Sequence, residues 1–178
     1  LEENFAEELL ESNRRPKGVI LRFNPNLYWS ERERRDLRGY RIWEEYSKYQ
    51  TSFVEPYDRS RSLSDESLID DFSKARKRIE QFRKGEKPTV EVFDIEKLAT
   101  YHAILDLVGG HHSLDWSDIK YFFNSISGKI EPVGYESFSA SEINTLSGLY
   151  NYVVDPVSTN VFHKMLFSDA AFFKQYIK

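Results

Sequence analysis

The sequence contains no cysteine, which excludes a disulfide scaffold, a cysteine-ligated zinc site and thiol catalysis. It has no run of about 18 uninterrupted apolar residues, the length that a membrane-spanning helix needs. It also lacks a Gly-rich phosphate loop and the Gly-x-Ser-x-Gly elbow of serine hydrolases. We therefore expect no transmembrane segment, and the motifs of these common enzyme classes are missing.

Large aromatic side chains, in contrast, are abundant. Three Trp, eleven Tyr and thirteen Phe make up 15% of the 178 residues, and hydrophobic residues make up 40%. This apolar content is enough to offset the entropy lost when a chain of this length folds around one core. The composition predicts a single folded domain over residues 1–178. Because Leu1 opens directly inside a helical pattern, we expect this domain to be a piece of a longer chain.

The charge of the chain is slightly negative and unevenly distributed. The net charge is −4, and phosphate backbones need a basic stripe, so nucleic acid is not an expected partner. Every arginine lies at or before Arg83, whereas acidic residues outnumber basic ones in the second half. Solvated helices explain this division, and two oppositely charged faces of one site are the alternative.

Periodicity and turn residues predict a mixed α+β fold, mostly helical, with one β-hairpin. Helices are predicted over 1–12, from Ser30, over 68–82, over 94–108, briefly after Ser139, and after a capping Ser168. Strands are predicted over 18–23, 119–123 and 129–135, the last two joined by the turn 124–128. The segment 51–62 is predicted to be irregular, and 111–118 is predicted to be a polar loop. Helix 94–108 is expected to be buried on nearly all sides.

Three acidic residues flank the predicted hairpin. Asp115 and Asp118 precede its first strand, and Glu136 follows its second strand. Because a tight hairpin brings its two ends together, Asp118 and Glu136 are expected to be neighbours. Two carboxylates together suit a hard cation such as Mg²⁺, which proteins hold with one or two carboxylates plus substrate phosphates. The alternative is that acidic residues follow strand ends simply because those ends face water.

Three stretches of the chain are distinctive: residues 5–23, 93–101 with 105–107, and 120–124 with 128–135. The most specific is the hairpin, with its Glu-Pro pair and terminal aromatic residue. In these stretches the chain resembles the spore-coat protein H (CotH) kinase-like family of bacteria. The resemblance implies the large lobe of an atypical protein kinase, with the small lobe upstream of residue 1. It also implies binding of ATP with Mg²⁺ or Mn²⁺ and transfer of phosphate to a protein hydroxyl.

Mapped onto this sequence, the resemblance assigns Asp118 and Glu136 to the metal and nucleotide, and Asp115 to the role of general base. The chain has Ser117-Asp118 where the family has His-Asn, and Glu136 where it has Asp. The longer glutamate would displace a metal that must bridge phosphates. The alternative function is therefore a catalytically silent pseudokinase that acts as a protein-interaction or structural module. The resemblance suggests a bacterial cell-envelope or spore context.

The histidines are interpreted as structural. His111 and His112 are adjacent at a helix end and have no zinc-ligand spacing, and one of them is explained by the helix dipole. His102 lies within a predicted buried helix and is expected to be a hydrogen-bonded core residue, and His163 has no partner evident in the sequence.

Overall fold

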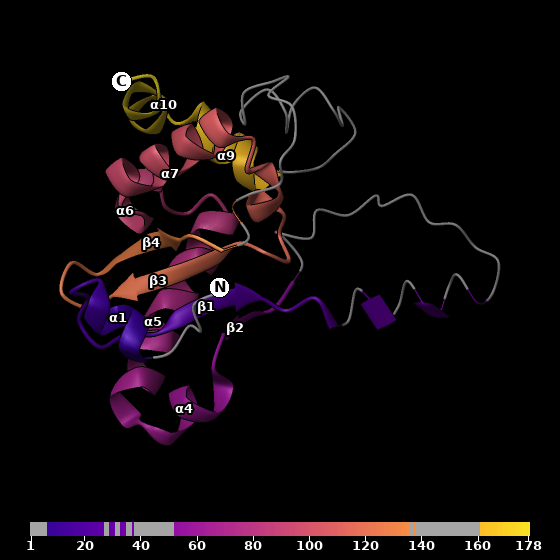
Figure 1. The fold of residues 1–178 in the computed structure, drawn as a ribbon, viewed down its shortest axis with the longest axis vertical. Helices are drawn as coiled ribbons and strands as arrows, with labels where there is room; N and C mark the ends of the chain where they lie inside the picture. Colours follow the sequence, from indigo (N-terminus) through magenta and orange to yellow (C-terminus); the bar gives the residue numbers. More distant parts are fainter. Residues whose placement is uncertain are drawn as a thin grey trace.

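A computed structural model describes residues 7–26, 29, 30, 33, 34, 37, 52–135, 137 and 161–178. These residues form a four-stranded antiparallel sheet and several helices (Figure 1), which confirms the α+β class. The strands are β1 (Ile20–Phe23), β2 (Val54–Pro56), β3 (Lys120–Asn124) and β4 (Lys129–Val133). The helices are α1 (Glu7–Ser12), α4 (Arg59–Ser64), α5 (Glu66–Arg83), α6 (Thr89–Val92), α7 (Ile95–Val108), the 3₁₀ helix η1 (His111–Leu114), α9 (Val161–Ser168) and α10 (Ala170–Tyr176).

The sheet has the strand order β2-β1-β3-β4. The predicted hairpin is confirmed: β3 pairs with β4 in the register Lys120 to Val133 through Asn124 to Lys129. Asn124 shapes its turn, because its side-chain oxygen accepts hydrogen bonds from the backbone N–H groups of Ile126 and Ser127. Gly128 completes the turn with φ +66°, a conformation that glycine adopts without steric cost. The return strand ends at Val133, two residues earlier than predicted.

One face of the sheet packs against the helices and forms the main core. Its buried side chains alternate with those of the opposite face, as the period of two in a strand requires. Phe162 of α9 lies at the centre of an aromatic cluster, with ring centroids 5.1 Å from Phe82, 5.9 Å from Phe23 and 6.0 Å from Phe93, all nearly perpendicular. Such edge-to-face pairs add to the stabilisation that comes from burying apolar area.

The two long helices lie within two residues of their predicted bounds. Asp65 caps α5 by accepting hydrogen bonds from the backbone N–H groups of Ser67 and Leu68. Asp94 caps α7 by accepting from the N–H of Lys97, and Gly109 ends α7 with φ +65°. The side of α5 that faces the core has four buried positions, Leu68, Ala75, Ile79 and Phe82, while Phe72 is partly buried.

Burial of α7 on nearly all sides is contradicted by the structure. Ile104, Leu107 and Val108 are exposed, and Leu107 keeps 76% of its surface accessible. The helix buries one side only, where Leu98, Ala99 and Leu105 join the main core and α10 packs alongside. The apolar residues of this helix did not by themselves show which side is buried, because single apolar residues are often exposed on protein surfaces.

Three local predictions are also corrected. The segment 51–62, predicted to be irregular, contains β2 and the start of α4, because Val54–Pro56 finds a pairing partner in the distant strand β1. The polar loop 111–118 begins with the 3₁₀ helix η1. Asp169 rather than Ser168 caps α10, since Ser168 is the last residue of α9 and donates its hydroxyl to the carbonyl of Lys164.

Some predicted elements fall outside the described residues. These are the first six residues of the helix over 1–12, most of the helix from Ser30 and the helix after Ser139. Among the helices of the described segments, none combines the length and hydropathy that crossing a membrane requires.

His102 is buried, as predicted, and it packs against a second buried histidine. Its ring lies 5.5 Å from that of His163, at nearly a right angle, and Phe167 and Phe172 surround the pair. Burial lowers the pKa of His163 to about 3, so its ring is neutral at pH 7. The spacing of 61 residues between the two histidines hid this contact from sequence analysis.

Candidate functional site

The candidate site lies at the open end of the β3–β4 hairpin. Asp118 lies two residues before the start of β3, and Lys120, the first residue of β3, pairs with Val133 at the end of β4. Asp118 thus stands where the two strands leave the sheet. Glu136, the predicted second ligand, lies outside the described residues, so its approach to Asp118 stays a prediction.

Two of the three predicted acidic residues converge on one hydroxyl. The Oγ of Ser117 lies 3.1 Å from Oδ1 of Asp115 and 3.1 Å from Oδ2 of Asp118. The Nε2 of His112 lies 3.6 Å from the same Asp118 oxygen. The side chain of Asp118 is 21% exposed and that of His112 is 58% exposed, so solvent and small ligands reach this cluster.

The backbone of residues 112–119 explains why these groups meet. Asp115 donates its N–H to the carbonyl of His112, and its own carbonyl accepts from the N–H groups of Asp118 and Ile119. Its carboxylate also accepts from the N–H of Ser117. Asp115, predicted to be the general base, therefore stabilises the turn in this structure, and its catalytic role stays a prediction.

Apolar anchors hold the two ends of this turn in the core. Leu114, Trp116 and Ile119 are buried, with exposed fractions of 5% or less. Their alternation with Asp115, Ser117 and Asp118 directs the polar side chains outward while the backbone remains fixed. The cluster is thus presented by a rigid turn.

Lys120 is a component of the site that sequence analysis missed. The residue is only 3% exposed, and its Nζ donates to the backbone carbonyls of Ser117 (3.0 Å) and Asp118 (2.8 Å). The same ammonium lies 4.7 Å from the ring centroid of Tyr135 and 6.0 Å from that of Tyr57. A buried positive charge therefore lies directly behind the backbone that carries the carboxylates. A lysine inside an apolar strand was the only signal in the sequence.

Gly110, just after α7, lets the segment that follows the hairpin pack against the backbone there. A Cβ at this position would lie 1.9 Å from the backbone oxygen of Ser137, which no side chain tolerates. The hydroxyl of Ser113 reinforces the same corner, since it donates to the carbonyl of Gly110 and accepts from the hydroxyl of Tyr101. The segment that follows β4 therefore packs beside the start of η1.

A second charged network, also missed from the sequence, lies on the same sheet. Glu131 of β4 has a side chain only 2% exposed, with Oε2 2.7 Å from Nη1 of Arg15 and Oε1 2.7 Å from Nζ of Lys97. Asn124 donates to the same Oε1 at 2.9 Å, and Lys97 also pairs with Asp94 at 2.8 Å. We call these five residues the Glu131 network.

The pKa shifts in the Glu131 network indicate that it is charged. Burial disfavours the ammonium form of Lys97, but hydrogen bonds to Asp94 and Glu131 outweigh this effect and raise the pKa of Lys97. Burial would raise the pKa of Asp94, yet hydrogen bonds from the Lys97 side chain and backbone lower it. The network connects the segment before β1 to the start of α7 and to β4, and thus supports the hairpin from the side.

The donor set suits a hard cation in part. Asp115 and Asp118 offer carboxylate oxygens, the ligands that Mg²⁺ and Mn²⁺ take together with phosphate oxygens. Within the described ranges, no three His, Asp or Glu side chains are grouped so that they could hold a metal by themselves. The described residues therefore fit a cation only if phosphates or further residues complete its coordination.

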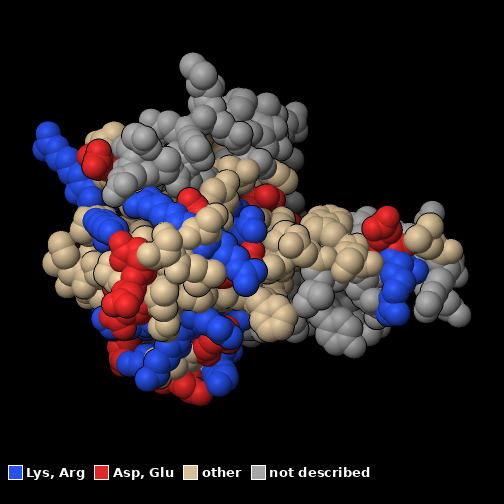
Figure 2. Space-filling model, turned by 90° about the horizontal axis from the view of Figure 1, so that it is seen from below, with Lys and Arg blue, Asp and Glu red and all other residues tan. Residues whose placement is uncertain are grey.

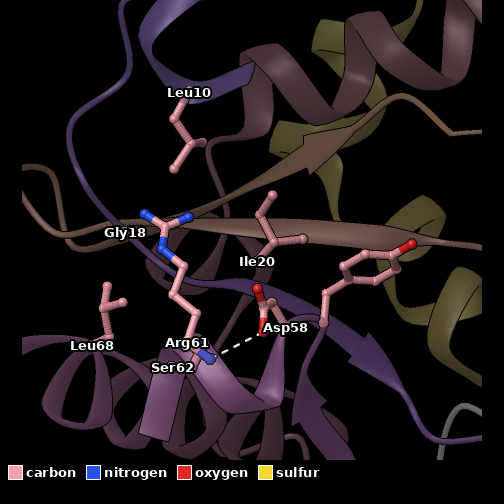
Figure 3. Close-up of a pocket in the computed structure, with 8 residues that line it drawn as sticks. Leu10, Gly18, Ile20, Asp58, Arg61, Ser62 and Leu68 are labelled. Carbon is pink, nitrogen blue, oxygen red and sulfur yellow. Dashed lines mark hydrogen bonds between the residues drawn. The ribbon is translucent and has the colours of Figure 1, made fainter. Parts of the chain in front are cut away.

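A small cavity between α1, β1 and α4 is not a competing site. Leu10, Gly18, Ile20 and Leu68 line it together with the polar residues of α4, where Asp58 accepts a hydrogen bond from the N–H of Arg61 (Figure 3). Its volume of about 20 Å³ accommodates one water molecule and no larger ligand.

Comparison with known proteins adds no relative from which a role could be transferred. We compared the chain with models of protein families, with curated proteins and with solved structures, and none of the three comparisons gave a match.

Proposed function

We propose that the open end of the hairpin binds a divalent cation together with the phosphates of ATP, as the resemblance to CotH-like kinases implies. One observation supports this most directly: Asp115 and Asp118 converge on the Ser117 hydroxyl at a rigid, solvent-accessible turn. Phosphoryl transfer depends mainly on positioning and on neutralising phosphate charge, and a fixed pair of carboxylates is suited to holding the cation that does this.

In this proposal Asp118 and Glu136 hold Mg²⁺ or Mn²⁺, and the bound cation neutralises phosphate charge. Lys120 keeps the backbone of Ser117 and Asp118 in place through its two hydrogen bonds. To act as a base, Asp115 would have to release the Ser117 N–H and accept a hydrogen bond from a substrate hydroxyl instead. The acceptor in the same proposal is a hydroxyl group of a protein.

The alternative is a silent relative that serves as a protein-interaction or structural module. A specific observation favours it: the described carboxylates of the site already have partners within the protein. Asp115 accepts from the Ser117 backbone, and Asp118 faces the Ser117 hydroxyl and His112. In this case the acidic residues maintain the turn and bind no cation.

A thermal-unfolding experiment separates the two functions. With Mn²⁺ and ATP at 100 times the dissociation constant, the proposal predicts about 2.7 kcal/mol of added stability, a rise in Tm of roughly 5–10 °C for a domain of this size. Asp118→Asn keeps the side-chain shape but removes its charge, and should abolish most of this rise. The measurement is differential scanning fluorimetry with Mn²⁺, ATP, or both.

Glu96→Gln provides the matched control for Asp118→Asn, because Glu96 is an exposed carboxylate on the first turn of α7. This variant should show the full ligand-induced rise in Tm. If the Tm of the folded protein does not rise with Mn²⁺ and ATP, the result supports the silent module. If both variants lose the rise equally, the cation binds elsewhere.

A further inference from the structure

A groove at the closed end of the hairpin is distinct from the candidate site. Its volume is about 390 Å³, and it lies between one side of α5 and the β3–β4 turn. One wall of the groove is formed by side chains of α5 at helical spacing, three of them basic. The opposite wall comes from the hairpin. The lining residues are Asp71, Lys74, Lys77, Arg78 and Gln81 of α5, then Lys87, and Phe123, Ser125 and Gly128 of the hairpin. The cation proposed above would lie at the other end of the same strands.

Positive charge predominates among the residues that line this groove. Lys74, Lys77, Arg78 and Lys87 contribute four cations, and Asp71 contributes the one acidic side chain of the lining. Figure 2 shows the molecule from below the view of Figure 1, where basic side chains stand beside acidic ones. The groove is thus a local basic strip on a chain whose net charge is −4.

One of these cations, Arg78, is held in place at the hairpin end of the groove, next to Lys129, which is not itself a lining residue. Arg78 donates from Nη1 to the carbonyl of Glu91 at 3.0 Å, and Lys129 donates to the same carbonyl. Arg78 also lies close to the turn, since a Cβ at Gly128 would lie 3.2 Å from its Nη2. The groove therefore has a preorganised cationic end.

Lys74 and Lys77 are available to a ligand, whereas Lys87 pairs with Glu91 at 2.6 Å. In the described part of the chain Lys77 forms no ion pair. Lys74 pairs with Asp70 at 2.5 Å, but both side chains are more than half exposed, and such surface pairs contribute little free energy. The lysine side chains can therefore turn toward an anion without a large loss of stability.

The pKa of the Glu91 carboxyl is consistent with a positive potential at this end. The hydrogen bond and charge of Lys87, together with the charges of Lys129 and Arg78, lower the pKa of the Glu91 carboxyl. An anionic group of a ligand placed near these three cations would be stabilised in the same way.

We propose that this groove binds an acidic peptide segment of a partner protein. From Asp71 to Gln81 the helix rises about 15 Å, which matches four to five residues of extended peptide. Small-molecule pockets are mostly apolar and enclosed, whereas this groove is open and lined by lysines, with Phe123 as its one aromatic lining residue. Nucleic acid is disfavoured because the basic strip covers only about 15 Å of helix, which is too short to follow a run of phosphates.

The test is isothermal titration calorimetry with a hexaglutamate peptide and a hexaglutamine control in 50 mM salt. We expect binding of hexaglutamate only, weakened at 200 mM salt because screening reduces ion pairing. Lys77→Glu should lower the affinity at least about tenfold, since it replaces attraction with repulsion. Asp71→Asn should raise the affinity about threefold, because it removes the one acidic lining residue and leaves shape unchanged.

Lys174→Glu on α10 is the control, because Lys174 is an exposed lysine of a helix that does not line the groove (Figure 1). It should bind the peptide like the unmodified chain, and circular dichroism should show the same fold in every variant. The proposal is overturned if the folded chain binds no hexaglutamate, if Lys174→Glu weakens binding as much as Lys77→Glu, or if a single-stranded oligonucleotide of equal charge binds more tightly. None of these outcomes depends on metal or ATP binding.

Discussion

Phe162→Ala is expected to lower the free energy of unfolding by about 3–5 kcal/mol, the range for truncating a fully buried aromatic residue. Phe162 has no exposed surface, and its ring contacts Phe23, Phe82 and Phe93 in edge-to-face geometry. Its removal leaves a cavity where α9 meets the sheet. For a domain of this size the Tm should fall by roughly 10 °C, measurable by thermal or urea denaturation.

Phe173→Ala is the matched control, because Phe173 lies on α10 and is 46% exposed. Its loss should cost less than about 1 kcal/mol, as is usual for surface positions. If the two variants were equally stable, α9 would not pack on the sheet as described.

Lys97→Met is expected to cost about 2–3 kcal/mol. The substitution keeps the apolar length of the side chain but removes the ammonium that lies 2.7 Å from the buried carboxylate of Glu131. Breaking a buried ion pair from one side typically costs 3–5 kcal/mol, because the remaining charge is left in a poorly solvating environment. The expected loss is smaller here because Arg15 and Asn124 still contact Glu131.

Lys87→Met is the control for Lys97→Met, because it removes a similar ion pair whose carboxylate is exposed rather than buried. Lys87 pairs with Glu91 at a similar distance of 2.6 Å, but the Glu91 side chain is 53% exposed. Surface pairs of this kind contribute about 0–1 kcal/mol, so Lys87→Met should hardly change a urea denaturation curve. Equal losses in the two variants would mean that the Glu131 network does not stabilise the fold through a buried charge.

Elements defined by neighbouring residues were predictable from the sequence. The hairpin, the cap Asp94 and the glycine at the end of α7 depend on residues within a few positions of one another. Strand β2 was missed because only its pairing with β1, more than 30 residues away, makes it a strand. Propensity carries no information about such a partner.

The candidate site likewise has parts that local sequence predicts and parts that depend on distant segments. The convergence of Asp115 and Asp118 follows from a turn of four residues, and the sequence indicated both carboxylates. The Glu131 network was missed because its members come from four separated segments, Arg15 before β1, Asp94 and Lys97 at the start of α7, Asn124 in β3 and Glu131 in β4. Lys120 was missed because strand alternation does not reveal that a lysine amine will be enclosed by two tyrosines.

The most direct test of the central claim is a paramagnetic titration of the ¹⁵N-labelled protein with Mn²⁺ in the presence of ATP. A bound Mn²⁺ ion broadens the NMR signals of nearby amides. If the open end of the hairpin holds the cation, the signals of residues 115–120 and 133–135 should broaden first and those of the turn 125–128 should remain sharp. Broadening centred on the turn or on α5, or none at saturating ATP, would contradict it.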